Sequence, residues 1–231
     1  MKKIFEKHET LMCMLLIVLY VVSNSYCMQN FGLTDYRGAI INTVFSVALL
    51  MLIISLKRVS YYGLTKVTNI KGYLYFVPLL LIVSVKLWNG IHINNTVGEI
   101  IFYIIAMLNV GFIEEIIFRG FLFKMMAKDN VKSAIIVSSI TFGMGHIVNL
   151  LNGADLVPTL IQIGCATAIG YLFVIIFYES KSLIPCIITH ALFNSLSIFY
   201  AENNSRMYMV PIVSFVVSAS YAVYINKKFK E

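Results

Sequence analysis

Long apolar runs separated by short polar segments dominate the sequence. A helix that crosses the hydrocarbon core of a bilayer needs about 17–25 mostly apolar residues, and runs of this length recur along the whole chain. Because a spanning segment must satisfy its own backbone hydrogen bonds, these runs predict an all-α, polytopic transmembrane helix bundle with about eight spans. The spans are expected near residues 11–29, 38–56, 73–90, 97–127, 131–149, 157–178, 183–200 and 208–225.

The composition supports a membrane protein with one integral membrane domain over residues 1–231. Hydrophobic residues make up 59% of the chain and charged residues 13%, which leaves little sequence for a soluble domain. The loops are short and polar, and no long linker interrupts the spans. The four cysteines, Cys13, Cys27, Cys165 and Cys186, are scattered without a Cys-x-x-Cys pair, so they indicate neither disulfides nor a thiolate metal site.

The net charge of +7 is distributed in a way that predicts topology. With eight spans, most Lys and Arg residues fall on the side that also holds both termini, whereas Arg37 and Arg206 fall on the other side and Lys86 near the outer end of the third span. This asymmetry follows the positive-inside rule and predicts cytoplasmic N- and C-termini. A nucleic-acid partner is not expected, because no aromatic motif accompanies the lysines. The alternative for the first run, after Met1-Lys2-Lys3, is a secretory signal peptide.

Three ionisable residues interrupt the apolar run at 97–127. Charges near the centre of a bilayer cost roughly 2.5–3.5 kcal/mol each, so they persist mainly where they pair, face a wet cavity or do chemistry. Glu115 and Arg119 are four residues apart on one helix face and are expected to form an ion pair. Glu114 is rotated by about 100° and is the freer carboxylate, a candidate base or metal ligand. The alternative is a purely structural charge cluster.

His146 is expected at the same depth as Glu114. Asp129-Asn130 is the predicted turn between two spans, and both residues lie roughly 22–24 Å from it along their helices at about 1.5 Å per residue. Gly143 and Gly145 beside the histidine would let a neighbouring helix backbone come close. The alternative for His146 is a hydrogen-bonded packing residue.

A third polar site lies in the run at 183–200, where His190 and Asn194 are four residues apart on one helix face. An imidazole and an amide there could both donate hydrogen bonds to a developing oxyanion. The alternative is polar contact between helices. Four further polar residues are expected to be such helix contacts or loop residues rather than catalytic residues, namely Asn149, Asn152, Gln162 and Thr189.

The order and spacing of these motifs resemble a known family. Glu-Glu-x-x-x-Arg, Phe-x-x-x-His and His-x-x-x-Asn occur in this order on successive predicted spans. This arrangement is similar to that of the CPBP family of intramembrane proteases, which includes CAAX prenyl endopeptidases and bacterial relatives linked to bacteriocin processing and self-immunity. The resemblance covers roughly residues 97–200. The motif residues are Glu114, Glu115, Arg119, Phe142, His146, His190 and Asn194.

The resemblance implies roles for these residues. Glu114 with His146 would activate a water, His190 and Asn194 would stabilise the tetrahedral oxyanion, and Glu115 with Arg119 would support the site. If a metal such as zinc is used, Glu114, His146 and His190 would be its ligands. The sequence lacks the His-Glu-x-x-His pattern of many zinc proteases, and both readings stay open.

The expected function is therefore that of an intramembrane endopeptidase acting on a membrane-associated peptide or protein. CAAX-type cleavage, processing of a bacteriocin or signal peptide, and self-immunity are the possible contexts. A cation or proton-coupled transporter also uses buried Glu and His, and a non-catalytic immunity or scaffold protein is the third reading. The composition suggests a bacterial protein of the plasma membrane whose other contact is the lipid bilayer.

Overall fold

The computed structural model describes residues 2–67, 76–201 and 208–228, and the regular structure in these residues is helical apart from one isolated bridge between Ile91 and Tyr200. The all-α prediction is thus confirmed. Six helical segments are long and apolar enough to cross a membrane: Glu9–Asn30, Tyr36–Ser55, Val97–Met126, Val131–Leu151, Leu156–Ser180 and Met209–Lys227.

The helices follow the predicted runs in chain order. They are α1 (Lys2–Lys7), α2 (Glu9–Asn30), α3 (Tyr36–Ser55), α5 (Val77–Ser84), α6 (Val97–Glu115), α7 (Lys124–Met126), α8 (Val131–Met144), α9 (Val148–Leu151), α10 (Leu156–Ser180), α11 (Ile184–Ser195) and α12 (Met209–Lys228). Tighter or wider helical turns continue several of them, namely the 3-10 helices η2 (Val85–Leu87), η4 (Gly145–Ile147) and η5 (Leu196–Phe199) and the π-helix η3 (Ile116–Phe123).

The prediction of eight full-length spans is wrong at two places. The runs at 73–90 and 183–200 form shorter apolar helices, Val77–Leu87 and Ile184–Phe199; residues 73–75 lie outside the described residues. Each begins with a proline in its first turn, Pro78 or Pro185. Proline favours the start of a helix because it lacks an N–H group, and the second helix, Ile184–Phe199, differs from its predicted run by one residue at each end.

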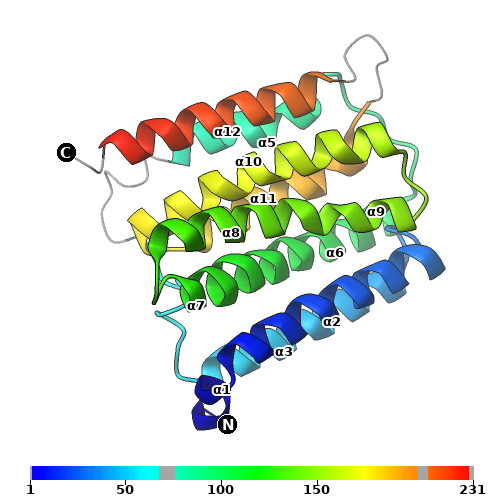
Figure 1. Cartoon of the computed structure of the whole chain (residues 1–231). Helices are drawn as coiled ribbons and strands as arrows, with labels where there is room; N and C mark the ends of the chain where they lie inside the picture. The colour runs from blue at the N-terminus through cyan, green and yellow to red at the C-terminus, as the bar shows by residue number, and fades with distance from the viewer. Residues whose placement is uncertain (1, 68–75, 202–207, 229–231) are drawn as a thin grey trace.

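The helices lie side by side, with α2 and α3 at one edge of the bundle and α5 and α12 at the other (Figure 1). Between these edges, α6 packs on α3 and α11, and α10 packs on α8 and α12. In an 18-residue apolar stretch of the α6 span, and in one of α10, half of the residues are buried, compared with 17% in α2. The α6 span, which carries Glu114, Glu115 and Arg119, and α10 therefore lie at the centre of the bundle.

Two glycines bring central helices into contact. A Cβ atom on Gly111 of α6 would lie 2.7 Å from the backbone nitrogen of Ala191 in α11, and one on Gly143 of α8 would lie 2.8 Å from the carbonyl oxygen of Ile163 in α10. The predicted close approach at Gly143 is confirmed. The same prediction for Gly145 is wrong, because no atom lies within 4 Å of a Cβ built there.

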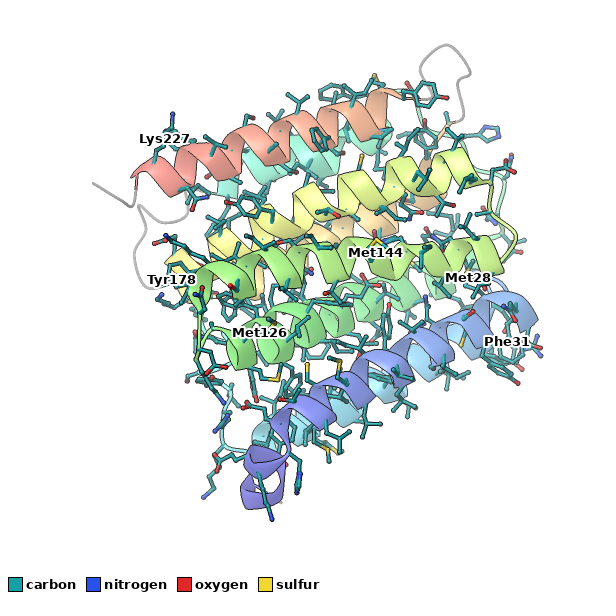
Figure 2. All side chains as sticks on the ribbon, viewed as in Figure 1. Met28, Phe31, Met126, Met144, Tyr178 and Lys227 are labelled. Carbon is teal, nitrogen blue, oxygen red and sulfur yellow. The ribbon has the colours of Figure 1, made fainter. Side chains whose placement is uncertain are left out.

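The two ends of the bundle differ in charge, because most of the described Lys and Arg side chains lie at one of them. We call the end that holds the start of α2, the α7–α8 turn and the end of α10 the basic end, and the opposite end the loop end. The predicted turn at Asp129 is present, and the Asn130 side chain caps α8 by accepting from the Ser133 backbone N–H at 3.0 Å. Figure 2 labels Met126, Tyr178 and Lys227 at the basic end and Met28 and Phe31 at the loop end.

Candidate functional site

The predicted ion pair between Glu115 and Arg119 is present at the centre of the bundle. Arg119 Nη1 donates to Glu115 Oε1 at 3.0 Å, and both side chains are fully buried. Arg119 lies on the π-helix η3, and its guanidinium also stacks over the Phe142 ring, 4.1 Å from the centroid. A buried ion pair is stable only when both charges remain partnered; the pair itself lies within the continuous α6–η3 helix, and the contact of Arg119 with Phe142 joins η3 to α8.

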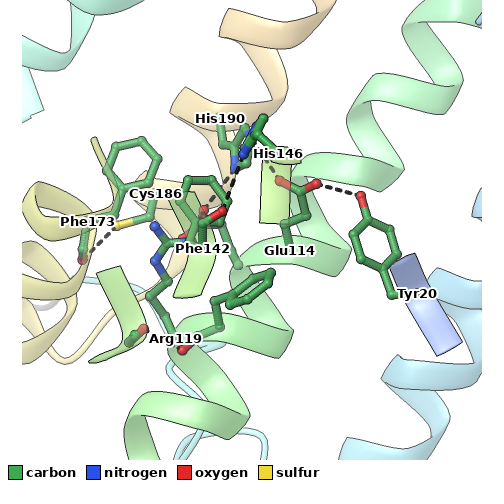
Figure 3. A network of polar contacts seen from close by, with 11 residues as sticks. Tyr20, Glu114, Arg119, Phe142, His146, Phe173, Cys186 and His190 are labelled. Atoms are coloured by element: carbon green, nitrogen blue, oxygen red, sulfur yellow. Dashed lines mark hydrogen bonds and ion pairs between the residues drawn. The ribbon is translucent and has the colours of Figure 1, made fainter. Parts of the chain in front are cut away.

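His190 of α11 lies between the two carboxylates. Its Nδ1 is 2.8 Å from Glu115 Oε1, and its Nε2 is 3.4 Å from Glu114 Oε2. The close contact between Gly111 and Ala191 holds α11 at this distance from α6. Arg119, Glu115, His190 and Glu114 therefore form one continuous polar network, which Figure 3 shows.

Tyr20 of α2 completes the network, and sequence reasoning missed it. The Tyr20 hydroxyl donates to Glu114 Oε1 at 2.6 Å, and the side chain is 4% exposed. A signal for Tyr20 did exist in the sequence, because the residue lies at the middle of the predicted span 11–29. Tyrosine in membrane helices prefers the interfaces with water, so a tyrosine at the centre of a span suggests a polar partner there.

His146 faces the same site from η4. Its ring lies edge-on to Phe142 at a centroid distance of 5.5 Å, and the His190 ring contacts the same phenylalanine at 5.6 Å. His146 Nδ1 is 3.3 Å from the Phe142 carbonyl oxygen. Within the described residues no hydrogen bond joins His146 to Glu114, so Phe142 is the contact that places the two histidines around one point.

A cavity of about 530 Å³ connects these side chains. Glu114, His146, His190 and Asn194 all line it, and the structure thus brings together the four residues named as catalytic candidates. Asn194 is half-buried, and its backbone carbonyl accepts from the Tyr103 hydroxyl at 3.3 Å. Glu115 and Arg119 lie behind this surface and support it.

The polar residues assigned to helix contacts mostly have that role. Asn149 donates to Gln162 at 2.8 Å, which joins α9 to α10. Asn152 accepts from Ser25 at 2.9 Å and from Gln29 at 3.0 Å, which joins the α9–α10 loop to α2. Thr189 also lines the cavity.

The residues that the resemblance implies as zinc ligands do not fit a metal site as they are placed. No group of three or more His, Cys, Asp or Glu side chains in the described residues is arranged so that it could hold a metal ion. Both ring nitrogens of His190 already face carboxylates.

A family model matches the part of the chain that holds the predicted site residues. Residues 96–196 match the family model described as type II CAAX prenyl endopeptidase Rce1-like. The chain contains a domain of this CAAX prenyl endopeptidase (CPBP) family. The resemblance inferred from the motifs is thus confirmed, and the match includes Glu114, His146, His190 and Asn194 but not Tyr20. No curated protein matches the chain.

Proposed function

We propose that this CAAX prenyl endopeptidase family protein is an intramembrane endopeptidase that hydrolyses a peptide bond of a membrane-associated peptide or protein. The observation that carries the proposal is the Glu114 carboxylate, which lines a cavity within the bundle and lies between the Tyr20 hydroxyl and the His190 imidazole. The match of residues 96–196 to a family of endopeptidases supports peptide-bond hydrolysis as the reaction.

In this mechanism Glu114 and His146 activate a water in the cavity. A general base must lie within about 2.6–3.2 Å of the group whose proton it takes. Both residues line the cavity, and the proposed mechanism requires a water bound between them. The water gives its proton to the base, Glu114, and the resulting hydroxide adds to the carbonyl carbon of the substrate.

His190 and Asn194 then stabilise the tetrahedral intermediate. A neutral His190 that donates from Nδ1 to Glu115 has an acceptor at Nε2, whereas the imidazolium has a donor at each nitrogen. We infer that the proton taken from water reaches His190 Nε2, which then donates to the oxyanion together with the Asn194 amide. When the C–N bond breaks, this proton passes to the leaving amine, and the charges balance.

Glu115 and Arg119 act as positioning residues. Glu115 Oε1 is 2.8 Å from His190 Nδ1 and accepts from Arg119 at 3.0 Å, which sets the orientation of the imidazole ring. A carboxylate that orients a histidine in this way also selects its tautomer. Neither Glu115 nor Arg119 lines the cavity, so the pair acts on the site through His190.

The proposal is tested by proteolysis in liposomes with a library of membrane-proximal peptides. Wild type is compared with Glu114→Gln, His190→Ala and Asn194→Ala, and Glu179→Gln is the control because Glu179 does not line the cavity. Loss of one oxyanion donor lowers kcat by roughly 10²–10³, so Asn194→Ala is expected to cut turnover by this amount while the protein stays folded.

Each assay is run with and without a zinc chelator, and cleavage is expected to persist after chelation. Full activity of Asn194→Ala would contradict its oxyanion role. If wild type cleaves no peptide although all variants fold, the chain is not a protease of such peptides. Cation flux in the same liposomes then tests the transporter reading, and its absence leaves a non-catalytic immunity or scaffold protein.

A further inference from the structure

The cavity extends from Glu114 toward one end of the bundle only. Its deep wall consists of buried side chains, including Tyr20 and His190, which are 4% and 7% exposed. Its exposed lining residues lie near the loop end, where Leu33 is 41% and Tyr208 is 46% exposed and Pro158 is also exposed. The mouth of the cavity therefore faces the loop end.

The path from Glu114 toward the basic end is closed. All eight residues of η3, which follows Glu114 and Glu115 in this direction, are buried. Their aromatic rings pack against neighbouring segments, with Phe121 on Tyr62 at a centroid distance of 4.6 Å and Phe123 on Phe177 at 6.0 Å. Water or a peptide can thus approach Glu114 from the loop end but not from the basic end.

The charges of the two ends differ sharply. Described Lys and Arg side chains gather at the basic end, where they are Lys7, Lys57, Arg58, Lys66, Lys124, Lys128, Lys132, Lys181 and Lys227. Near the loop end the described residues provide Arg37 and Lys86, and Arg37 is neutralised by Asp35 at 2.8 Å. The predicted charges Lys71, Arg206 and Lys230 lie outside the described residues. By the positive-inside rule the basic end is cytoplasmic.

We propose that the cavity opens to the external side of the membrane and receives a peptide segment that reaches the membrane from that side. This assignment differs from a site that opens to the cytoplasm and takes cytoplasmic lipidated tails. The substrate class is then an exported peptide or the external juxtamembrane segment of a membrane protein. The orientation of the cavity stands on the structure and the charges alone, whereas the substrate class rests on the proposed function.

The orientation is tested by labelling single cysteines with a small, membrane-impermeant thiol reagent in bacterial cells that express the full chain. Cys165 and Ser197 line the cavity, Gln162 lies on its exposed rim, and the other native cysteines, Cys13, Cys27 and Cys186, are buried. Wild type, which presents Cys165, is compared with Gln162→Cys and Ser197→Cys in a Cys165→Ser background. Lys132→Cys in the same background is the matched control at the basic end.

Labelling of Gln162→Cys, and of at least one of Cys165 and Ser197→Cys, is expected in intact cells. Lys132→Cys is expected to react only after permeabilisation. The reverse pattern would place the mouth in the cytoplasm and overturn the proposal. Reaction of Gln162→Cys without reaction of either cavity position, or no reaction at Gln162→Cys from either side, would show that no water path leads to the cavity from outside and would also overturn it.

The substrate class is tested separately with right-side-out and inverted membrane vesicles. Peptides added to the medium are expected to be cut by right-side-out vesicles and not by inverted ones. Cleavage only by inverted vesicles would overturn the external substrate. Because cysteine labelling requires no turnover, a chain that cleaves nothing can still show the predicted orientation, so failure of the proposed function and failure of this inference are distinguishable.

Discussion

The α6–η3 segment is packed inside the bundle, whereas α2 lies at its edge and has few buried residues. In the α6–η3 span half of the apolar window is buried, and it carries a fully buried ion pair. In α2 only 17% of the window is buried, and its buried residues are Cys13, Tyr20 and Cys27. One of these three donates a hydrogen bond to Glu114 at 2.6 Å.

This difference shows how a peripheral helix can contribute to a central site. Apolar side chains of α2 gain little from burial, because lipid and protein interior are similarly apolar. The Tyr20 hydroxyl differs from these apolar side chains, because a polar group without a hydrogen-bond partner in hydrocarbon costs several kcal/mol. We expect the polar contact, rather than apolar packing, to fix the position of α2 beside Glu114.

The largest expected effect comes from breaking the buried ion pair. Arg119→Met leaves the Glu115 carboxylate buried without its cation, and such changes cost about 3–5 kcal/mol. The free energy of unfolding in detergent should fall by this amount. The matched control is Arg37→Met, because its pair with Asp35 is exposed to solvent and its loss should change the free energy of unfolding little. Similar losses of stability in both variants would show that the buried pair stabilises the fold no more than the exposed pair does.

Closing the contact between α6 and α11 is the next largest change. Gly111→Ala places a Cβ atom 2.7 Å from the Ala191 backbone nitrogen, and overpacking of this kind costs about 1–3 kcal/mol. Because His190 is adjacent to Ala191, proteolytic turnover should fall together with the melting temperature. Gly98→Ala in the same helix meets no atom within 4 Å and is the control. Equal behaviour of the two variants would refute a constraint at Gly111.

Removal of the Tyr20 hydroxyl tests the link between the two regions. A hydrogen bond to a charged group contributes about 1.5–3 kcal/mol, so Tyr20→Phe should lower kcat by roughly tenfold or more with little change in KM if Tyr20 positions Glu114. Tyr26→Phe on the same helix, at a position 55% exposed, is the control. In a Glu114→Ala background, where no acceptor remains for the Tyr20 hydroxyl, Tyr20→Phe should cause no further loss of stability, and additive losses would show that the two side chains are not coupled.

The smallest expected effect lies at the loop end, in the α2–α3 connection. Hydrogen bonds from Arg37 lower the pKa of Asp35 from its usual 3.8 to about 2. A carboxyl group with a lowered pKa stabilises the folded state above its unfolded pKa, and this contribution is lost as the pH falls toward 2. Asp35→Asn should therefore be slightly less stable than wild type at pH 6, and the difference in melting temperature should vanish near pH 2. A difference that is constant with pH would exclude this pair as its source.

The sequence predicted the helices well where the apolar run ended at polar residues. The six helices that are long and apolar enough to cross a membrane lie within a few residues of their predicted positions, because hydropathy and polar boundaries agree there. The other two runs form shorter helices, Val77–Leu87 and Ile184–Phe199, and each of these has a proline in its first turn. Gly143 was predicted to allow close packing and does so, whereas Gly145 with the same residue type does not.

The sequence by itself determined an all-α membrane protein, a family domain and the pairing of Glu115 with Arg119. These follow from hydropathy, from motif order and from the helical spacing of four residues, all of which are local. Only the tertiary structure placed Tyr20 on Glu114, His190 between two carboxylates and the cavity mouth at the loop end. Contacts between residues 75 or 94 positions apart depend on how helices pack, and local spacing carries no information about that packing.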